Sequence, residues 1–502
     1  MSLKRNILAS YASQFYVTLI GIFMVPIYVH YMGVEAYGLI GFFAMLQAWF
    51  QLFDMGLTPT LARETARFVT GSEADALQLR RLLRSLEGIF VCIALVVCAA
   101  LILGSGSIAG SWLKVQQLPL QEVERSISLM VLNIGVRWVS SLYRGAITGF
   151  ERLVWLGGLN VMLATVRFLL VVLVFIFVGT SPTVFFEYQL VITAIELVLL
   201  VNQTYRLLPK ISLGHHLDWG WGPLRTVLKF SLSMAFVNLT WVVLMQSDKL
   251  LLSKLLPLDE YAYFSLATLM ASGIFMLSNP ISIALLPRLT RLSAEENHFA
   301  LLGLYRESTQ LVGVIVIPAV LVLSFFAEQV LWVWTGNADL AHKVAPVLTL
   351  YAVGNGIVAL GAFPYYLQFA KGDLRLHIIG TVLLLAILMP AILWGTQHYG
   401  MVGAGYAWVG VNALYFLFWL PKVHGRFVKG LHTLWLLQDV GVIMLSSSTA
   451  AALLYYLIVW PSGRLVDAVC ILMLSVMLLA VSTASSSQMR AKIGARWRMA
   501  FS

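Results

Sequence analysis

About fourteen apolar segments, each close to the length of a bilayer crossing, alternate with short polar loops along this 502-residue chain. A helix that crosses about 30 Å of hydrocarbon needs roughly 20 apolar residues, and most of the segments approach that length. Inside lipid every backbone N–H and C=O group must be paired, which a helix achieves within one segment. The sequence therefore predicts an all-α integral membrane protein with about 14 transmembrane helices.

The composition supports this prediction. Hydrophobic residues make up 60% of the chain and charged residues 11%, whereas roughly a quarter of residues are charged in a typical soluble domain. The mean hydropathy is +0.86. No predicted loop exceeds roughly 35 residues, which is too short for a separate soluble domain. The predicted spans are residues 11–29, 37–53, 86–103, 127–147, 155–178, 184–208, 230–252, 261–286, 311–332, 346–369, 376–394, 402–420, 440–460 and 466–481.

The 33 Lys and Arg residues are distributed unevenly between the loops. The two terminal segments and every second loop hold 25 of them, Arg144 and Arg306 included, and the intervening loops hold five. The remaining three, Arg137, Arg167 and Lys249, lie within apolar segments. Because basic residues concentrate on the cytoplasmic side, both termini are predicted to be cytoplasmic. This topology and anionic lipid headgroups account for the net charge of +10 without a nucleic-acid partner.

The sequence shows no pattern that predicts a cofactor, a metal site or a catalytic residue. The three cysteines lie within predicted spans and lack the spacing of a metal site or a disulfide framework. The glycines of residues 400–405 follow no predicted strand, so we interpret them as a helix-packing element rather than a nucleotide-binding loop. The chain contains no Gly-Lys dipeptide, which excludes a P-loop for ATP hydrolysis.

The first and second groups of six spans have similar features in the same order. Residues 32–37 and 256–261 occupy equivalent links, and Pro59 with Arg63 is echoed by Pro287 with Arg291. Six crossings place both groups in the same orientation, as in transporters built from parallel repeats. The alternative is chance similarity of helix-end signals. We predict two same-orientation six-helix bundles, residues 1–210 and 211–430, followed by two C-terminal helices and a basic cytoplasmic tail within residues 431–502.

Polar residues recur on single faces of several predicted spans. In the fourth span the spacings are four, three and four residues, which place the side chains on one helix face; these residues are Asn133, Arg137, Ser140 and Arg144. In the sixth span a comparable stripe contains Gln189, Thr193, Glu196 and Gln203. Such stripes are unfavourable against lipid, so they are expected to face other helices or a water-filled cavity.

Three charges lie near the middle of their spans. Arg137, Arg167 and Glu196 are about ten to twelve residues from both ends, or roughly 15 Å from either surface. A charge at that depth costs at least ~2.5 kcal/mol, so each needs a partner or hydration. One glutamate cannot neutralise two arginines. We therefore predict a cavity that binds an anion, in which Glu196 neutralises one arginine until the anion arrives; the alternative is a purely structural ion-pair network.

Four further residues are candidates for the same function. Asn133 and Trp241 lie on polar stripes of the fourth and seventh spans and are predicted to contact the substrate. Asp54 and Asp248, together with Glu196, are candidates for binding a coupling ion or acting as counter-ions. Asp248 is adjacent to Lys249 near the outer end of its span, and the alternative there is a water-exposed helix end.

Three motifs carry a resemblance to a known family: Met-Gly-Val-Glu-Ala-Tyr-Gly at 32–38, Phe-Asp-Met-Gly-Leu-Thr-Pro at 53–59, running into Arg63-Glu64, and Tyr-Gly-Met-Val-Gly-Ala-Gly at 399–405. In these motifs the chain resembles the polysaccharide flippases (Wzx-like O-antigen translocases) of the multidrug/oligosaccharidyl-lipid/polysaccharide (MOP) exporter superfamily. The predicted helix count agrees with that superfamily, which includes multidrug and toxin extrusion (MATE) transporters and lipid flippases, over nearly the full length.

The resemblance implies a transporter rather than an enzyme. The substrate would be an oligosaccharide linked to undecaprenyl pyrophosphate, an O-antigen or similar repeat unit, translocated across the bacterial cytoplasmic (inner) membrane by alternating access. It also implies a possible coupling ion, H⁺ or Na⁺, and as possible partners a polysaccharide polymerase and a chain-length regulator.

Several alternatives remain open. A multidrug or cation antiporter of the same superfamily is expected to have a carboxylate in the first helix. Lipid II flippases have basic residues in that helix. In this chain, residues 11–29 contain no Asp, Glu, Lys or Arg, which disfavours both alternatives. A membrane glycosyltransferase or polymerase would need catalytic residues on a sizeable outer loop, and the predicted outer loops are short. A non-enzymatic polysaccharide assembly partner remains a further alternative.

Overall fold

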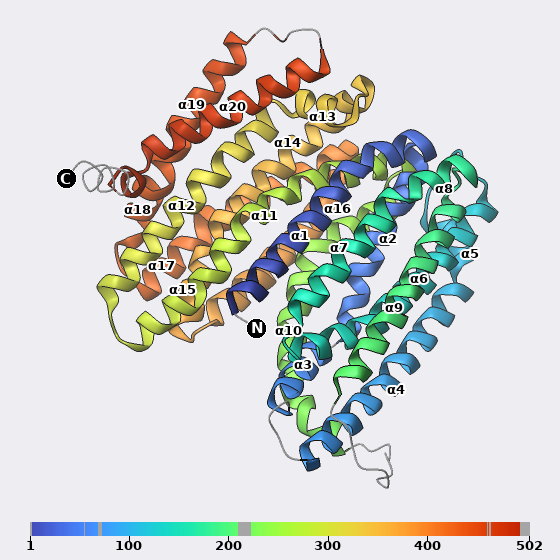
Figure 1. The fold of residues 1–502 in the computed structure, drawn as a ribbon. Coiled ribbons are helices and arrows are strands. Elements are labelled where there is room, and N and C mark those ends of the chain that lie inside the picture. Colours follow the sequence, from blue (N-terminus) through green and yellow to red (C-terminus); the bar gives the residue numbers. More distant parts are fainter. Residues whose placement is uncertain are drawn as a thin grey trace. The chain divides into compact units, whose positions relative to one another are not determined.

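The computed structural model describes residues 3–54, 56–68, 73–208, 222–458, 460 and 463–491. Within these ranges all the named elements are helices, with a single isolated bridge between Lys114 and Pro257, so the predicted all-α class is confirmed (Figure 1). The chain divides into two compact units, Met1–Ala262 and Tyr263–Ser502.

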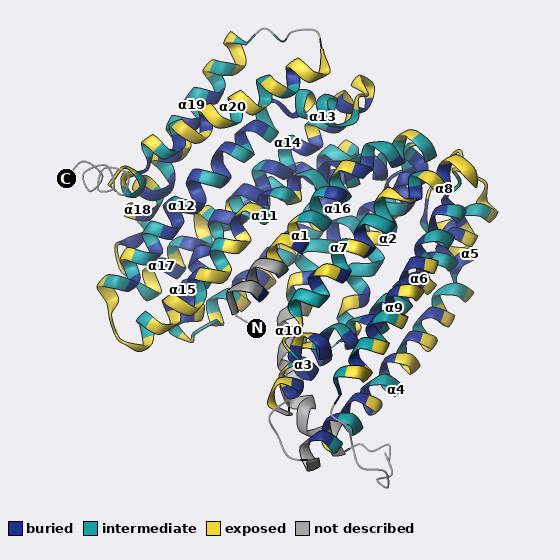
Figure 2. Cartoon of the chain, in the orientation of Figure 1, coloured by how far each residue is buried: buried dark blue, intermediate teal, exposed yellow. Residues whose placement is uncertain are grey.

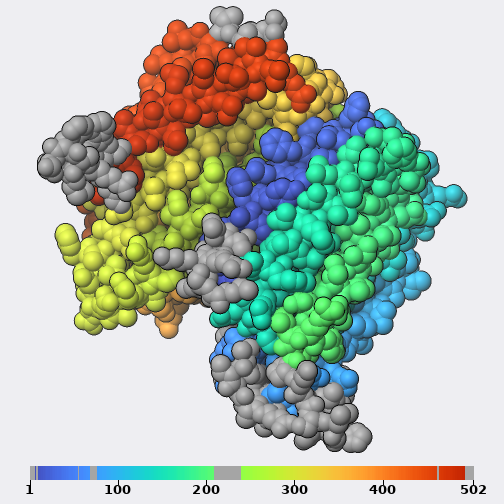
Figure 3. Space-filling view, in the orientation of Figure 1, coloured from blue at the N-terminus to red at the C-terminus, as the bar shows by residue number. Residues whose placement is uncertain are grey.

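Unit 1 is organised around α6, which packs against α3, α4 and α9, while α1 packs against α7. The side chains of α1, α7 and α9 form one continuous face of this unit (Figure 3). Its elements are α1 (Leu3–Met32), α2 (Val34–Phe50), η1 (Gln51–Asp54), α3 (Leu57–Phe68), α4 (Glu73–Leu103), α5 (Ser105–Ser107), η2 (Ile108–Trp112), α6 (Leu120–Gly149), α7 (Leu153–Leu169), α8 (Val171–Phe177), α9 (Pro182–Leu207), α10 (Gly222–Leu255) and the first turn of α11 (Leu258–Ala294).

Unit 2 is organised around α12, which packs against α14, α19 and α20. The last two long helices therefore pack directly on α12. The elements after α11 are α12 (His298–Phe325), α13 (Ala327–Thr335), α14 (Ala338–Gly361), α15 (Phe363–Lys371), α16 (Arg375–Leu414), η3 (Tyr415–Trp419), α17 (Leu420–Phe427), α18 (Leu431–Leu434), η4 (Trp435–Gly441), α19 (Val442–Leu457) and α20 (Arg464–Ser485).

Eleven helical segments of the described chain are long and apolar enough to cross a membrane. In addition, α6 and α10 contain 30 and 34 residues, and α16 consists of two helices joined at Gly400. Fourteen spans, the two six-helix bundles and their boundaries at residues 210 and 430 stay predictions. Exposed residues occur along several helices (Figure 2), and they include large apolar ones, for example Leu95, Val96 and Leu103 on α4. Lipid is the solvent that suits such a surface.

The turn at Gly400 explains the glycines around it. Gly400 has φ 57° and ψ −143°, a backbone conformation that is almost restricted to glycine. The two helices that leave this turn approach each other at Gly395 and Gly403, where a Cβ atom on either residue would collide with the backbone of the other. The glycines therefore form a tight helix-packing element.

Glu35 explains part of the motif at residues 32–38. Its carboxylate is buried in the first turn of α2 and accepts hydrogen bonds from three successive backbone N–H groups, those of Gln116 (2.5 Å), Gln117 (2.9 Å) and Leu118 (3.0 Å). The loop before α6 is thus held on α2 by a carboxylate whose lone pairs are largely satisfied. The role of Glu35 is to position this loop.

Candidate anion-binding site

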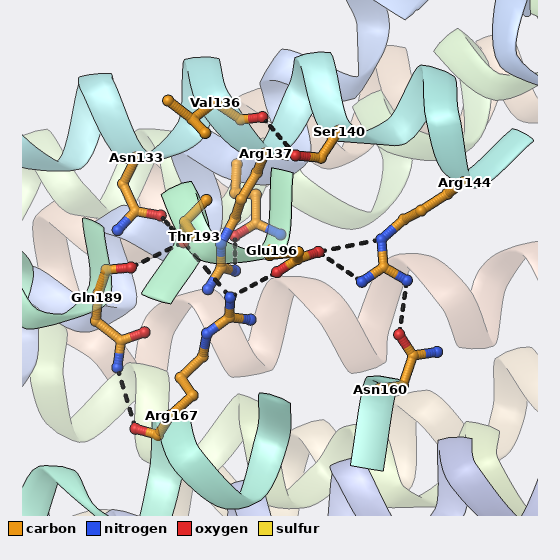
Figure 4. Close-up of polar contacts among 11 residues, drawn as sticks. Asn133, Val136, Arg137, Ser140, Arg144, Asn160, Arg167, Gln189, Thr193 and Glu196 are labelled. Carbon is orange, nitrogen blue, oxygen red and sulfur yellow. Dashed lines mark hydrogen bonds and ion pairs between the residues drawn. The ribbon is translucent and has the colours of Figure 1, made fainter. Parts of the chain in front are cut away.

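A cluster of polar and charged side chains lies between α2, α6, α7 and α9 of unit 1 (Figure 4). The polar stripe of α6 faces the polar stripe of α9 because these two helices pack together along much of their length. In α9, Gln189, Thr193 and Glu196 are all buried. The predicted residues Asn133, Arg137, Arg167 and Glu196 therefore meet in one place.

Glu196 lies at the centre of the cluster. Its Oε1 accepts hydrogen bonds from Nε (3.1 Å) and Nη2 (2.5 Å) of Arg144, and its Oε2 accepts one from Nη2 of Arg167 (2.8 Å). Only 5% of the Glu196 side chain is exposed. The carboxylate is therefore removed from water and is compensated by two guanidinium groups.

Arg144 is a member of this site that our sequence analysis placed on the polar face of the fourth span but counted among the basic residues of the following loop, and so left out of the predicted site residues. In the structure α6 continues to Gly149, and Arg144 lies inside it. Arg144 finds polar partners on α9 and α7: Glu196, and Asn160, whose Oδ1 accepts a hydrogen bond of 2.6 Å from Nη1. Its seven-residue spacing from Arg137, which places both on one face, could have added it to the predicted site.

Arg167 is attached to α9 by weaker contacts besides its ion pair. Its Nη2 lies 3.4 Å from Oγ1 of Thr193, and its backbone carbonyl accepts a hydrogen bond of 3.4 Å from Nε2 of Gln189. The Nε atom of Arg167 is buried and has no hydrogen-bond partner within the described ranges. Because α7 and α8 form one apolar segment, Leu153–Phe177, this guanidinium lies well inside a candidate span.

Arg137 has neutral partners. Its Nη1 donates a hydrogen bond of 2.9 Å to Oε1 of Gln47 on α2, and its Cζ lies 5.5 Å from the centre of the Phe43 ring. In the described part of the chain it forms no ion pair, and its Nε is buried without a hydrogen-bond partner. Gln47 and Phe43 orient this guanidinium without cancelling its charge.

Asn133 lies to one side of the charged groups (Figure 4) and is fully buried. Its Oδ1 is 3.0 Å from Oγ1 of Thr193, which is also 2.8 Å from the carbonyl oxygen of Gln189. The single hydroxyl proton of Thr193 can serve only one of these acceptors at a time. The Nδ2 of Asn133 has no hydrogen-bond partner in the described part of the chain. The amide is therefore a buried donor beside the charged cluster.

Three guanidinium groups and one carboxylate give the cluster a formal charge of +2. Within helices that are otherwise apolar, a positive charge acts over a longer range than it does in water. Guanidinium groups bind phosphate and carboxylate oxygens through pairs of N–H donors. Chemically, the arrangement suits an anion with several oxygens; among the described residues no group of three or more His, Cys, Asp or Glu side chains could hold a metal ion.

The other predicted site residues have different surroundings. Asp54 accepts hydrogen bonds from the backbone N (3.2 Å) and Oγ1 (2.5 Å) of Thr58 and so caps the start of α3. Asp248 is buried in α10 and accepts a hydrogen bond of 2.8 Å from the backbone N of Lys249. Trp241 on α10 is 56% exposed. In the described ranges, neither Trp241 nor Asp54 forms a hydrogen bond or ion pair with the three arginines.

Unit 2 contains a buried ion pair that our sequence analysis missed. Asp439, in η4, is fully buried and accepts hydrogen bonds from Nε (2.7 Å) and Nη2 (3.0 Å) of Arg306 and from Nε2 of Gln310 (2.7 Å). The assignment of Arg306 to a basic loop was wrong, because α12 begins at His298 and includes this residue.

Gln310 connects the same pair to the C-terminal end of the described chain. Its Oε1 accepts hydrogen bonds from Oγ of Ser486 (2.7 Å), Oγ of Ser487 (3.3 Å) and the backbone N of Gln488 (3.1 Å). The ion pair and Gln310 together attach η4 and the end of α20 to α12. This arrangement is a structural ion pair with one positive and one negative charge.

The fold resembles several solved membrane transporters. The lipid II flippase MurJ in an inward closed conformation has a TM-score of 0.70 at 13% identity, covering 95% of this chain and 98% of that one. An inward-facing MATE multidrug transporter of the MOP superfamily has a TM-score of 0.64 at 14% identity, covering 82% and 94%. A MOP superfamily transporter from Pyrococcus furiosus has a TM-score of 0.55 at 13% identity, covering 84% and 95%. The protein therefore has the fold of the MOP superfamily.

The sequence itself defines the family. The profile of the family described as "Polysaccharide biosynthesis protein" matches residues 3–293, which is more than half of the chain. The chain belongs to the polysaccharide biosynthesis protein family. None of the curated protein sequences matches it.

Proposed function

We propose that the protein is a flippase that translocates an oligosaccharide linked to undecaprenyl pyrophosphate, an O-antigen or similar repeat unit, across the cytoplasmic membrane by alternating access. The observation that carries the proposal is the cluster of charge +2 inside apolar helices, in which Arg137 has only neutral partners among the described residues. Membership of a polysaccharide biosynthesis family supports the glycan part of the substrate.

The chemistry of such a substrate matches the site. The polyprenyl tail can remain in lipid, whereas the pyrophosphate carries negative charges that cost much free energy in hydrocarbon. Arg137 and Arg167 would bind the pyrophosphate oxygens through N–H donors that are not engaged by Glu196. When the anion arrives, Arg167 exchanges Glu196 for a phosphate oxygen, while Glu196 remains paired with Arg144.

The energy source in this proposal is an ion gradient, H⁺ or Na⁺, or consumption of the product on the outer side, because the sequence has no P-loop. Glu196 is the preferred counter-ion candidate, since it forms ion pairs with Arg144 and Arg167. Asp54 caps α3 and Asp248 accepts a backbone hydrogen bond beside Lys249. Cytoplasmic termini, the bacterial inner membrane, and a polymerase and a chain-length regulator as partners belong to the same proposal.

The test is made in a bacterial strain that depends on this chain for surface polysaccharide. Without the chain, lipid-linked sugar of unchanged structure should accumulate on the cytoplasmic leaflet; an enzyme defect would change the sugar instead. Arg137→Ala combined with Arg167→Ala should abolish translocation, and Arg→Lys at both positions should retain part of it because charge persists without the planar fork.

The matched control is Arg152→Ala, which removes an exposed arginine of the same unit. Surface polysaccharide at the unaltered level in the double alanine variant would refute the anion site. Loss of folded protein in that variant, but not in Arg152→Ala, would favour the structural ion-pair network instead.

A multidrug or cation antiporter remains the second candidate, on the basis of the shared fold. The positive charge of the site disfavours an antiporter of cationic drugs, because a cluster of charge +2 repels cations. A non-enzymatic assembly partner is separated from a flippase by the same leaflet assay, since its loss would leave lipid-linked sugar on the outer leaflet.

A further inference from the structure

We propose that Arg144 is a positioning residue: it holds Glu196 and thereby leaves the donors of Arg167 available to the anion, without contacting the anion itself. This inference rests on the proposed function and concerns the regulation of the same site. It begins from how the two arginines share one carboxylate.

The hydrogen bonds of the two arginines to Glu196 are unequal. Arg144 uses Nε and Nη2 on Oε1, at 3.1 and 2.5 Å, and its Nη1 is bound to Asn160 at 2.6 Å. Three of its five N–H donors thus have short hydrogen bonds to protein acceptors. Arg167 donates to Glu196 only through Nη2, at 2.8 Å, with a longer contact of 3.4 Å to Thr193. Glu196 is therefore held mainly by Arg144.

Asn160 fixes Arg144 in this role. Its Oδ1 accepts from the nitrogen of the guanidinium that does not reach Glu196. A planar guanidinium held at both edges keeps its orientation when a neighbouring partner leaves. If Arg167 turns toward an incoming anion, Glu196 keeps two of its three hydrogen bonds and remains a compensated buried carboxylate. The departure of Arg167 thus leaves no unpaired charge behind.

The consequence is a dependence of anion affinity on a residue that does not bind the anion. Without the grip of Arg144, Glu196 would take up more donors of Arg167 and compete with the anion for them. Arg144→Lys keeps the charge of the cluster at +2, but a single ammonium group cannot reproduce the hydrogen bonds to Glu196 and Asn160. We expect this variant to bind inorganic pyrophosphate about tenfold more weakly than the unchanged protein.

The test uses isothermal titration of inorganic pyrophosphate into the purified full chain. The variants are Arg144→Lys, Glu196→Gln, Arg144→Lys with Glu196→Gln, Asn160→Ala, and Arg152→Ala as an exposed control. Glu196→Gln raises the charge of the cluster to +3, so the double variant is compared with Glu196→Gln alone. Positioning predicts that Arg144→Lys no longer weakens binding in that background, because the competitor for Arg167 is then uncharged. Asn160→Ala, which changes no charge, should weaken binding about threefold, and Arg152→Ala should not change it.

Each contrary outcome overturns the inference in a recognisable way. Unchanged affinity in Arg144→Lys would mean that only the net charge matters. A double variant that binds more weakly than Glu196→Gln alone would mean that Arg144 binds the anion directly. If Arg144→Lys does not fold, unchanged affinity in Asn160→Ala refutes positioning. Absence of binding by the unchanged protein, or full binding by the Arg137→Ala, Arg167→Ala double variant, would instead remove the proposed function on which the inference rests.

Discussion

The arginine cluster of unit 1 and the Arg306–Asp439 pair of unit 2 place the same chemical groups inside apolar helices, yet in different ratios. In unit 2 one arginine meets one aspartate through two hydrogen bonds of 2.7 and 3.0 Å. In unit 1 two arginines pair with one glutamate, and a third arginine, Arg137, hydrogen-bonds the neutral Gln47. A balanced pair has no remaining charge with which to bind a ligand. An unbalanced cluster retains positive charge, which an anion can neutralise.

The hydrogen-bond donors show the same contrast. Arg306 uses Nε and Nη2 on Asp439, and Nη2 also reaches Gln438 at 3.0 Å. In the unit 1 cluster, by contrast, the buried Nε atoms of Arg137 and Arg167 and the Nδ2 of Asn133 lack hydrogen-bond partners among the described residues. Buried polar groups in a purely structural network are normally all paired. The comparison therefore fits a structural role for the unit 2 pair and supports the binding role that we propose for the unit 1 cluster.

The largest effect on stability is expected from Asp439→Ala. The substitution leaves Arg306, whose side chain is 28% exposed, without its partner, and breaking a buried ion pair in this way costs about 3 kcal/mol. Denaturant titration in mixed micelles should show this loss of unfolding free energy. Asp339→Ala, which removes an exposed ion pair with Lys343, should cost less than about 1 kcal/mol. Equal losses in the two variants would contradict the structural role of the Arg306–Asp439 pair.

Glu35→Ala should have the next largest effect. This third buried carboxylate is held by three backbone N–H groups, which the substitution leaves without their acceptor; the expected loss of unfolding free energy is about 2 kcal/mol. The same titration measures it, with the exposed Glu124→Ala as control. An unchanged unfolding free energy would show that the loop before α6 is held by other contacts.

Replacing both members of the unit 2 pair, Arg306→Met with Asp439→Leu, should change the unfolding free energy by no more than about 1 kcal/mol, because apolar residues of similar size often replace a buried ion pair without loss. The amide of Gln310 retains Ser487 as a partner at 3.1 Å. Translocation should continue in this variant. Loss of translocation in a normally folded double variant would show that the pair takes part in transport, and would contradict the contrast drawn between the unit 1 cluster and the unit 2 pair.

The smallest effect is expected from Gln47→Leu, which removes the hydrogen bond that orients Arg137 but no charge. Pyrophosphate affinity should fall about threefold, the equivalent of one ordinary hydrogen bond. Gln51→Leu, at an exposed position after α2, serves as the control. A loss as large as that of Arg137→Ala would mean that Gln47 itself contacts the anion.

The periodicity of polar residues predicted which helix faces carry the site. The spacing predicted that the stripes at Asn133–Arg144 and Gln189–Glu196 face other helices or a water-filled cavity rather than lipid. That these two stripes meet each other is seen in the packing of α6 against α9. Which arginine would hold Glu196 did not follow from the spacing either. That choice depends on the rotation and axial offset of α6 against α9 and α7, since Arg144 contacts Glu196 on α9 and Asn160 on α7.

Arg306 illustrates a second limit of the sequence. The apolar segment predicted for its span begins at residue 311, yet α12 begins at His298 because partners far along the chain, Asp439 among them, satisfy its polar residues. Hydropathy records the preference of a segment for lipid, not the presence of such partners. The sequence likewise did not predict Gln47 and Phe43 as neighbours of Arg137, since the packing of α2 against α6 depends on the tertiary structure.

The turn at Gly400 has a consequence for how the chain is built into the bilayer. Trp394, Tyr399 and Tyr406 are exposed around it, as aromatic residues are where a helix reaches the headgroups. Only one non-helical residue separates the two helices of α16, so neither helix can cross the bilayer independently of the other. We expect the insertion machinery to release both helices together as a helical hairpin. Deletion of either helix should therefore also prevent insertion of the other.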